Sequence, residues 1–219
     1  KKLPYDPSKE LKVVTVLAEM PHVVVAPPSL AVGNLKDLAA LASKNPGQLN
    51  FGSAGVGSSV HMMGELFKLA AKAPITHVPY KGSSAALNDL MGGQIQLMFE
   101  NPPTVIQHVK AGKLKALAVT GKQRLAALPD VPTGIESGYP AFEATSWTTI
   151  AVGAKVPDAI ADKLNADIRK VVNSPEFRKG LEDQGMTPVA NTRDVAANFI
   201  VSEKARWDKV IEQGHLNAD

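Results

Sequence analysis

A stretch rich in glycine and serine at residues 52–59 carries the strongest chemical signal in the sequence. A strand pattern leads into it and a helix pattern leads out of it. Glycines let the backbone turn sharply and let a ligand approach the main-chain amides. The unpaired N–H groups and positive dipole end of the following helix suit a carboxylate or phosphate. The stretch therefore predicts an anion site; the alternative is a tight turn with a serine cap. The residues that we expect to bind the anion are Ser53, Ala54, Gly55, Gly57 and Ser58.

This loop departs from the familiar nucleotide and hydrolase motifs. A P-loop would close with Gly-Lys-Ser or Gly-Lys-Thr, which the stretch lacks. A dinucleotide fingerprint running through Gly55 and Gly57 needs a third glycine where the chain has Val60. A nucleophile elbow needs Gly-x-Ser-x-Gly, which is also absent. Because these three motifs are excluded, we expect the loop to bind a small anion.

His61 lies about one turn into the helix that follows the loop. It can either donate a hydrogen bond to the anion or pack beneath the loop, and the sequence does not separate these alternatives. His61 and Glu65 are four residues apart on one helix face, as metal ligands can be. Two residues do not make a metal site, so we expect an ordinary helix pair and no metal.

Two further polar loops also join a strand pattern to a helix pattern, at residues 79–84 and 100–103. In an open parallel sheet such loops gather beyond the carboxyl ends of the strands, where ligands bind. Tyr80 could stack or hydrogen-bond, and Lys81 could supply charge or simply be solvated. Glu100, followed by Asn101, could hold an amine or hydroxyl of the ligand, or could cap the next helix.

The elements that must position these loops alternate between strands and helices. Apolar β-branched runs predict strands over 11–17, 22–26, 48–51, 76–79, 94–99, 115–120 and 147–152. Helical spacing and capping residues predict helices over 34–44, 58–71, 83–91 (with a serine cap) and 103–111. In the second helix we expect Met62, Leu66 and Leu69 to point inward. This rhythm predicts an α/β fold with a largely parallel sheet covered by helices on both faces.

The chain changes character after Gly121, where prolines and glycines punctuate a long connection. Thr133 and Glu136 predict a capping box, with room for a brief helix. Beyond Pro157 three amphipathic helices follow a single strand, so we infer that part of the surface they should cover is missing from this chain. The division that we expect is a ligand-binding lobe over 10–125, a connection over 126–145, and the remaining strand and helices of the other lobe over 146–219.

Composition narrows the class of protein. The chain has 219 residues, 44% of them hydrophobic, a net charge of +3 and no cysteine. No stretch approaches the roughly 20 apolar residues that cross a bilayer. The lysines and arginines are spread out and lack interleaved aromatics, so we expect no nucleic-acid partner. The absence of cysteine excludes disulfides and thiol catalysis. The first residues carry no secretory signal, so we expect a removed signal or a start inside a longer protein.

Three motifs together resemble a known family. They are Gly52-Ser-Ala-Gly-x-Gly-Ser-Ser-x-His61, His77-Val-Pro-Tyr-Lys-Gly82 and Leu128-Pro-Asp-Val-Pro-Thr133. In this order they are similar to the solute receptors of tripartite tricarboxylate transporters, also called Bug-type receptors. The opening Lys2-Leu-Pro-Tyr-Asp-Pro7 and the strand at Ser146-Trp147 fit as well, so the resemblance covers essentially the whole chain.

The resemblance implies a type II periplasmic-binding-protein-like fold that closes on a carboxylate between two lobes. Members of the family have a long stretch before the opening motif, so we expect the first lobe to be incomplete here. Where the family tends to carry Asp-Asn, this chain has Glu100-Asn101. The implied function is that of a periplasmic receptor, not an enzyme and without a cofactor, which binds a di- or tricarboxylate or an amino acid for membrane transporter subunits.

Two other functions stay open at this point. An α/β enzyme acting on a small anionic metabolite would need a poised base or nucleophile, for which His61 with Ser58 or Ser59 is the only candidate pair. A dimer through the exposed apolar faces of the C-terminal helices is compatible with either function.

Overall fold

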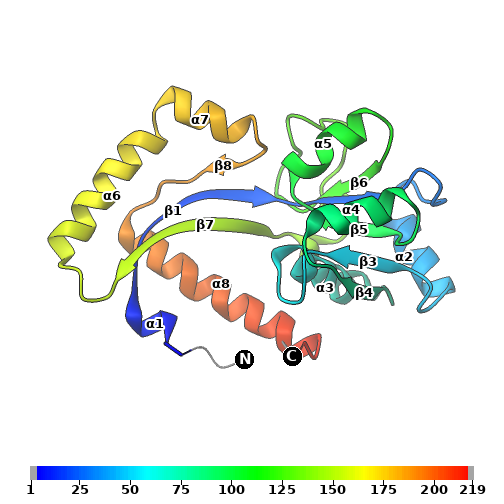
Figure 1. Ribbon diagram of the computed structural model, residues 1–219, viewed down its shortest axis with the longest axis horizontal. Helices are drawn as coiled ribbons and strands as arrows, with labels where there is room; N and C mark the ends of the chain where they lie inside the picture. Colours follow the sequence, from blue (N-terminus) through cyan, green and yellow to red (C-terminus); the bar gives the residue numbers. More distant parts are fainter. Residues whose placement is uncertain (1–3, 217–219) are drawn as a thin grey trace. The chain divides into compact units, whose positions relative to one another are not determined.

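The computed structural model describes residues 4–216, which divide into two compact units (Figure 1). One unit is built from Met20–Ser146; the other combines the residues up to Glu19 with those from Trp147 onward. Lys2 and Leu3 of the opening motif, and the last three residues of the expected 146–219 segment, lie outside the described residues.

A five-stranded sheet forms the centre of the 20–146 unit, in the order β4-β3-β5-β2-β6. Its strands are β2 (Val23–Ala26), β3 (Asn50–Ser53), β4 (Thr76–Pro79), β5 (Leu97–Glu100) and β6 (Lys115–Val119). β3 runs parallel to β4 and β5, whereas β2 runs antiparallel to β5 and β6. Four strands thus share one direction and β2 opposes them, so the sheet is mixed where we expected a largely parallel one.

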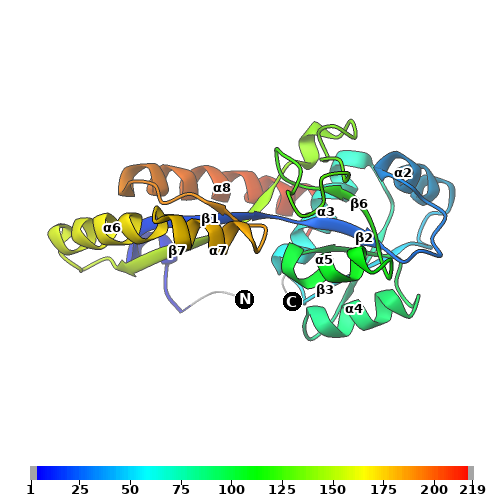
Figure 2. The same ribbon diagram turned by 90° about the horizontal axis from the view of Figure 1, so that it is seen from above.

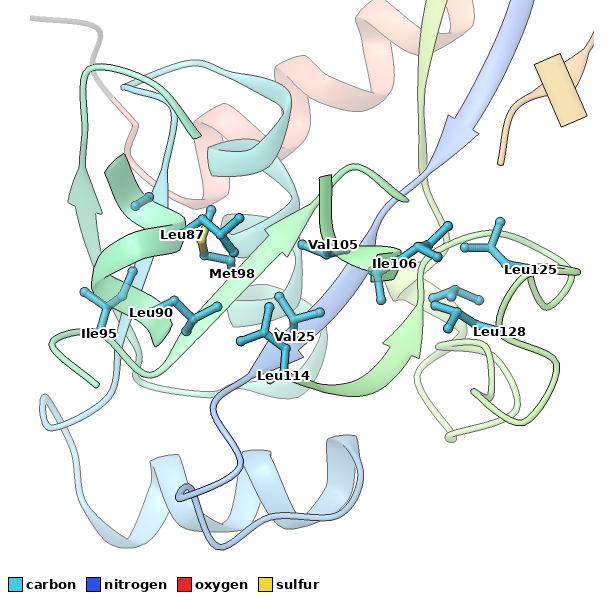
Figure 3. Close-up of a cluster of buried hydrophobic side chains, with 13 residues drawn as sticks. Val25, Leu87, Leu90, Ile95, Met98, Val105, Ile106, Leu114, Leu125 and Leu128 are labelled. Carbon is cyan, nitrogen blue, oxygen red and sulfur yellow. The ribbon is translucent and has the colours of Figure 1, made fainter. Parts of the chain in front are cut away.

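Helices cover both faces of this sheet (Figure 2). They are α2 (Leu35–Lys44), α3 (Ser59–Ala71), α4 (Ser83–Met91) and α5 (Pro102–Lys110). On one face, α4 and α5 pack on Val23, Val25 and Met98 to form the apolar cluster of Figure 3. On the other face, Phe67 of α3 lies against Phe99 of β5. The strand ends between these two packed layers are where the polar loops emerge.

Most predicted boundaries are shifted by a few residues, and three details of the prediction are wrong. Leu66 is buried in α3 as predicted, together with Val60, Met63 and Phe67, while Met62 and Leu69 are only half-buried. No serine caps α4, because its N-cap is Gly82 at φ 137° and makes no side-chain capping bond.

The connection after Gly121 keeps its predicted capping box but not its predicted helix. Thr133 N–H donates to the Glu136 carboxylate at 2.7 Å, and Glu136 N–H donates to the Thr133 hydroxyl at 3.0 Å. These bonds enclose turns at residues 134–138, and a 3-10 helix, η1 (Pro140–Phe142), follows them. The glycines and prolines of this stretch stop the turn from propagating.

The second unit holds a three-stranded sheet in the order β7-β1-β8. Its elements are α1 (Pro7–Glu10), β1 (Leu11–Pro21), β7 (Thr145–Gly153), α6 (Asp158–Val172), α7 (Pro175–Glu182), β8 (Thr187–Pro188) and α8 (Arg193–Gln213). We expected one strand to accompany the C-terminal helices. Instead β1 comes from the start of the chain and β8 from between two helices, and β1 pairs with β8 antiparallel.

The helices of this unit still leave apolar surface uncovered. Ile160 and Val171 are 52% and 54% exposed on α6, although both belong to its apolar stripe. Val171 also lines a groove of about 270 Å³, together with residues that include Leu17, Ile150, Ile168, Val172 and Phe177.

The two units do not coincide with the expected division of the chain. Residues 10–19 group with the C-terminal helices, and residues 126–145 group with the sheet of the 20–146 unit. Ala144 N–H, for example, donates to Thr120 O at 2.9 Å. How the complete protein divides into lobes stays a prediction.

Candidate ligand-binding site

The glycine- and serine-rich loop and the two other polar loops emerge at one edge of the 20–146 sheet. They follow β3, β4 and β5, whose parallel pairing brings their carboxyl ends together. The register pairs Ser53 with Pro79, so the first loop starts beside the second. Tyr80 N–H donates to Ser53 O at 3.0 Å and links them. The predicted grouping of these loops is thus present.

The loop needs glycine at two positions for conformational reasons. Gly55 has φ 125° and Gly57 has φ 78°, a region that other residues rarely adopt. Gly55 also lies close to the neighbouring loop, because a Cβ there would be 3.5 Å from Tyr80 O. The two glycines turn the chain back so that helix α3 can begin at Ser59.

Ser53 anchors the start of the loop from a fully buried position. Its Oγ accepts the N–H of Gly55 and donates to the Gly55 carbonyl, both at 3.1 Å. The same Oγ lies 2.6 Å from Nε2 of His77. A hydroxyl has one proton to donate and two lone pairs. All three bonds form together only when His77 carries its proton on Nε2 and donates it to Ser53.

Ser58 caps helix α3 and braces the loop. Its Oγ accepts the N–H of His61 at 3.3 Å and donates to Gly55 O at 2.7 Å. Among residues 4–216, the N–H groups of Val56, Ser59 and Val60 have no protein acceptor. Three amide donors around the first turn of a 13-residue helix suit a small anion in geometry and charge.

His61 lies beneath the loop with both ring nitrogens directed at protein groups. Its Nδ1 accepts the N–H of Gly57 at 3.1 Å, and its Nε2 lies 3.6 Å from the Glu65 carboxylate. Lys68 pairs with the other oxygen of Glu65 at 2.8 Å. Burial raises the pKa of Glu65, but hydrogen bonds from His61 and Lys68 outweigh it and lower that pKa below its ordinary value. His61 therefore contacts the loop from behind.

Two histidines that we did not expect at the site contact its residues. His77 stacks on His61 and contacts Ser53. His22, just before β2, places Nε2 3.4 Å from the Ser59 hydroxyl. His77 and His22 are 24 and 37 residues from these partners along the chain, so no local pattern places them at the site. For His77 one signal was present, since it opens the motif that continues into Tyr80.

Tyr80 and Lys81 take different positions in the second loop. The Tyr80 hydroxyl donates to Asp89 on α4 at 2.7 Å, and its ring lies over Gly52, where a Cβ would be 3.4 Å from it. Burial, followed by the bond to Asp89, raises the pKa of Tyr80 to about 12. Lys81 is exposed. The ring of Tyr80 thus supports the sheet edge, while Lys81 contributes positive charge at the surface.

Glu100 and Asn101 end the neighbouring strand, β5. Glu100 is fully buried, and its Oε1 accepts the N–H of Asn101 at 2.7 Å and its side-chain amide at 3.1 Å. In the part of the chain that the structure describes, Glu100 Oε2, Asn101 Oδ1 and His22 Nδ1 have no hydrogen-bond partner. Buried polar atoms without partners are uncommon and concentrate at functional sites.

No group of three His, Cys, Asp or Glu residues able to hold a metal ion occurs within residues 4–216. Within the same residues, no helix combines the length and apolarity needed to span a membrane.

The sequence matches the model of the tripartite tricarboxylate transporter family receptor over residues 1–216. The chain is 35% identical over 211 residues to the protein BugT of Bordetella pertussis. This match covers 96% of the chain and 65% of the relative, so the chain spans about two thirds of that protein's length.

Solved structures give the same assignment. MatC of Rhodopseudomonas palustris with bound malate is 30% identical, with a TM-score of 0.83, and the match covers 96% of this chain and 73% of that one. R. palustris Rpa4515 with adipate is 32% identical, with a TM-score of 0.89, and the match covers 99% of this chain and 72% of that one. The predicted α/β fold of the periplasmic-binding-protein type is confirmed. The chain belongs to the tripartite tricarboxylate transporter receptor family.

Proposed function

We propose that the protein is a periplasmic solute receptor that binds a small carboxylate, either a di- or tricarboxylate or an amino acid. The acid would be passed to the membrane subunits of a tripartite tricarboxylate-type transporter. Family membership supports the receptor class and the transporter partner, and the periplasmic location is supported by a solved relative that is described as the periplasmic binding protein BugD.

The observation that carries this proposal is the set of amides around Ser58. The N–H groups of Val56, Ser59 and Val60 are free to donate, and the positive end of α3 lies behind them. Lys81 adds a positive charge from the adjacent loop. One carboxylate matches this arrangement in size and charge.

The ligands of two relatives support an acid with two carboxylates. MatC binds malate and Rpa4515 was solved with adipate. One carboxylate of such an acid would meet the amide set, and the other would extend away from it. Glu100 and Asn101 offer acceptor atoms for a hydroxyl or ammonium group on the ligand, which favours hydroxy acids and amino acids over plain dicarboxylates.

We favour a receptor over an enzyme because two of the three serines beside histidines, Ser53 and Ser58, have hydroxyls committed elsewhere. Ser53 touches His77 but is fully buried and already bonded to Gly55. The Ser58 hydroxyl donates to a backbone carbonyl. A nucleophile needs an accessible oxygen and a base positioned to take its proton. Dimerisation through the C-terminal helices stays a prediction, which light scattering over a range of protein concentrations would test.

Calorimetric titration tests the function. The chain, and the full product of the gene that encodes it, would be titrated with malate, adipate, a tricarboxylate, glutamate and a neutral amide of matched size. We expect one-to-one binding of at least one acid, no binding of the neutral amide, and weaker binding in Ser58→Ala.

A folded full gene product that binds none of the acids contradicts the proposal. So does binding of the neutral amide as tightly as its acid, because recognition would then not involve the carboxylate. Steady conversion of a bound acid into a product, followed by NMR, would favour the enzyme alternative instead.

A further inference from the structure

Two imidazole rings, one buried (His61) and one half-buried (His77), stack beneath the ligand loop. The ring centroids of His61 and His77 are 3.8 Å apart and the planes meet at 27°. His61 comes from α3 and His77 from β4, and the ring of Phe51 on β3 packs against both. The charged groups near the pair are Glu65 and Lys68 of α3. The stack therefore joins three elements directly below the loop.

Each imidazole holds a different glycine of the loop. His61 Nδ1 accepts the N–H of Gly57. His77 donates from Nε2 to Ser53, whose hydroxyl in turn holds both the N–H and the carbonyl of Gly55. The two glycines with positive φ are thus each fixed by a hydrogen bond that begins or ends at this pair.

The bond from Gly57 requires a neutral His61 ring with its proton on Nε2, and the bond to Ser53 requires a proton on Nε2 of His77. His61 must leave Nδ1 unprotonated to accept from Gly57, while His77 must donate from Nε2 to complete the bonds of Ser53. Burial lowers the pKa of His77 to about 4; positive charge on Lys68, and on His61 whenever that ring is protonated, lowers it further, while Glu65 opposes this lowering. His77 is therefore neutral near pH 7.

We propose that His61 and His77 are positioning residues for the bound anion. His61 fixes Gly57 and His77 fixes Gly55 through Ser53. By holding these two glycines, the pair orients the amides of Val56, Ser59 and Val60. This inference rests on the proposed function of the loop. A pre-formed loop avoids the entropy that ordering it on binding would cost. Neither ring contacts the ligand in this proposal, and each acts through the loop.

Two amide side chains distinguish the roles of the two ring nitrogens. Asparagine places its amide group near Nδ1 of a histidine, whereas glutamine places it near Nε2. His61→Asn keeps an acceptor for Gly57, and His61→Gln loses it. His77→Gln keeps a donor for Ser53, and His77→Asn loses it. All four variants lose an aromatic ring, so the loss of stacking is shared.

We expect the two substitutions to rank in opposite orders at the two positions. The asparagine variant should bind the acid more tightly than the glutamine variant at position 61, and the glutamine variant more tightly than the asparagine variant at position 77. The affinity for malate, adipate or whichever acid binds best should fall about tenfold or more in His61→Gln and His77→Asn, the effect of losing one well-placed hydrogen bond. His61→Asn and His77→Gln should retain most of it. If the histidines only support the core, affinity will follow thermal stability and the order will not reverse between positions. That outcome overturns the proposal.

A second measurement needs no ligand. NMR of the ¹⁵N-labelled protein should show both rings as neutral Nε2–H tautomers at pH 7.5, and a scalar coupling from the Gly57 amide nitrogen to Nδ1 of His61. If this coupling is absent, or if either ring carries its proton on Nδ1, the proposal is overturned regardless of which acid the protein binds. Presence of both, with no acid bound by the folded protein, refutes the proposed function and with it the role of the pair in positioning an anion.

Discussion

Nε2 of His22 lies 3.4 Å from the hydroxyl of Ser59, so a fully buried histidine just before β2 meets the first residue of the helix behind the ligand loop. Burial lowers the pKa of His22 from 6.5 to about 4, as it also does for His77. Both rings are thus kept neutral by the fold at pH values where the unfolded chain protonates them.

The protein should lose stability on acidification between pH 6.5 and about 4. In this window the unfolded chain binds protons that the folded chain excludes, so the free energy of unfolding falls with falling pH and levels off below about 4. The lowered pKa of His22 contributes at most about 3 kcal/mol to this change in the free energy of unfolding. Urea unfolding at a series of pH values measures the slope.

Three variants identify the groups responsible for this pH dependence. His22→Gln and His77→Gln cannot be protonated, so each should flatten the dependence of stability on pH. His215→Gln is the matched control, because His215 is exposed near the end of the chain and should leave the slope unchanged. If all three variants keep the slope of unfolding free energy against pH that the unsubstituted protein shows, other groups cause the acid sensitivity.

Substitution at the two loop glycines should have unequal effects. Gly57 lies at φ 78°, close to the left-handed well, with no atom within 4 Å of an added Cβ. Gly57→Ala should therefore cost about 1 kcal/mol of unfolding free energy. Gly55 lies at φ 125°, outside that well, and its Cβ would approach Tyr80 O. Gly55→Ala should cost about 2–3 kcal/mol. Chemical denaturation measures both, and Gly153→Ala, with open space and ordinary φ, is the control. A smaller loss for Gly55→Ala than for Gly57→Ala would contradict this geometry.

The cap of α3 should matter for both stability and binding. Ser58→Ala removes the acceptor for His61 N–H and should cost about 1 kcal/mol, with a parallel loss of acid affinity because the first turn carries the free amides. Ser58→Thr keeps the hydroxyl and should keep both properties. Thr192 occupies the N-cap of α8 but makes no capping bond, so Thr192→Ala should have a smaller effect on the denaturation midpoint. Unchanged affinity in a folded Ser58→Ala protein would argue against an anion at this helix end.

Local patterns predicted the loop that forms the candidate site. Glycine spacing and the serine at the N-cap are read within ten residues of chain, and Gly55, Gly57 and Ser58 lie where those patterns placed them. The capping box at Thr133 and Glu136 was predicted for the same reason. Each of these features depends on bonds between residues at most four apart.

Long-range pairing explains what the sequence did not reveal. His77 reaches Ser53 because β4 lies beside β3 in parallel register, and no local pattern encodes that neighbour. Strand β8 is two residues long and therefore has no alternation to recognise. β2 opposes the other strands of its sheet, yet its own apolar run would look the same in either direction.

A buried amide in the other unit supports a last prediction. Asn165 of α6 donates from its side-chain nitrogen to Val14 O at 2.8 Å and to Asn191 O at 2.9 Å. Asn165→Asp would direct a carboxylate oxygen at two carbonyl oxygens, so the free energy of unfolding should fall by about 3 kcal/mol or more at pH 7. Asn165→Leu, which leaves the carbonyls unpaired but adds no charge, should cost less, about 1–3 kcal/mol.

Acid should partly rescue the aspartate variant, which makes this prediction specific. A carboxyl group that is buried against carbonyl oxygens has a raised pKa, and once protonated it can donate one of the two lost hydrogen bonds. The deficit of Asn165→Asp relative to the unsubstituted protein should therefore shrink as the pH falls toward 5, while that of Asn165→Leu stays constant. Denaturant titrations of the three proteins at pH 7 and pH 5 provide the comparison. A constant deficit for Asn165→Asp would mean that its side chain has turned away from Val14 O and Asn191 O.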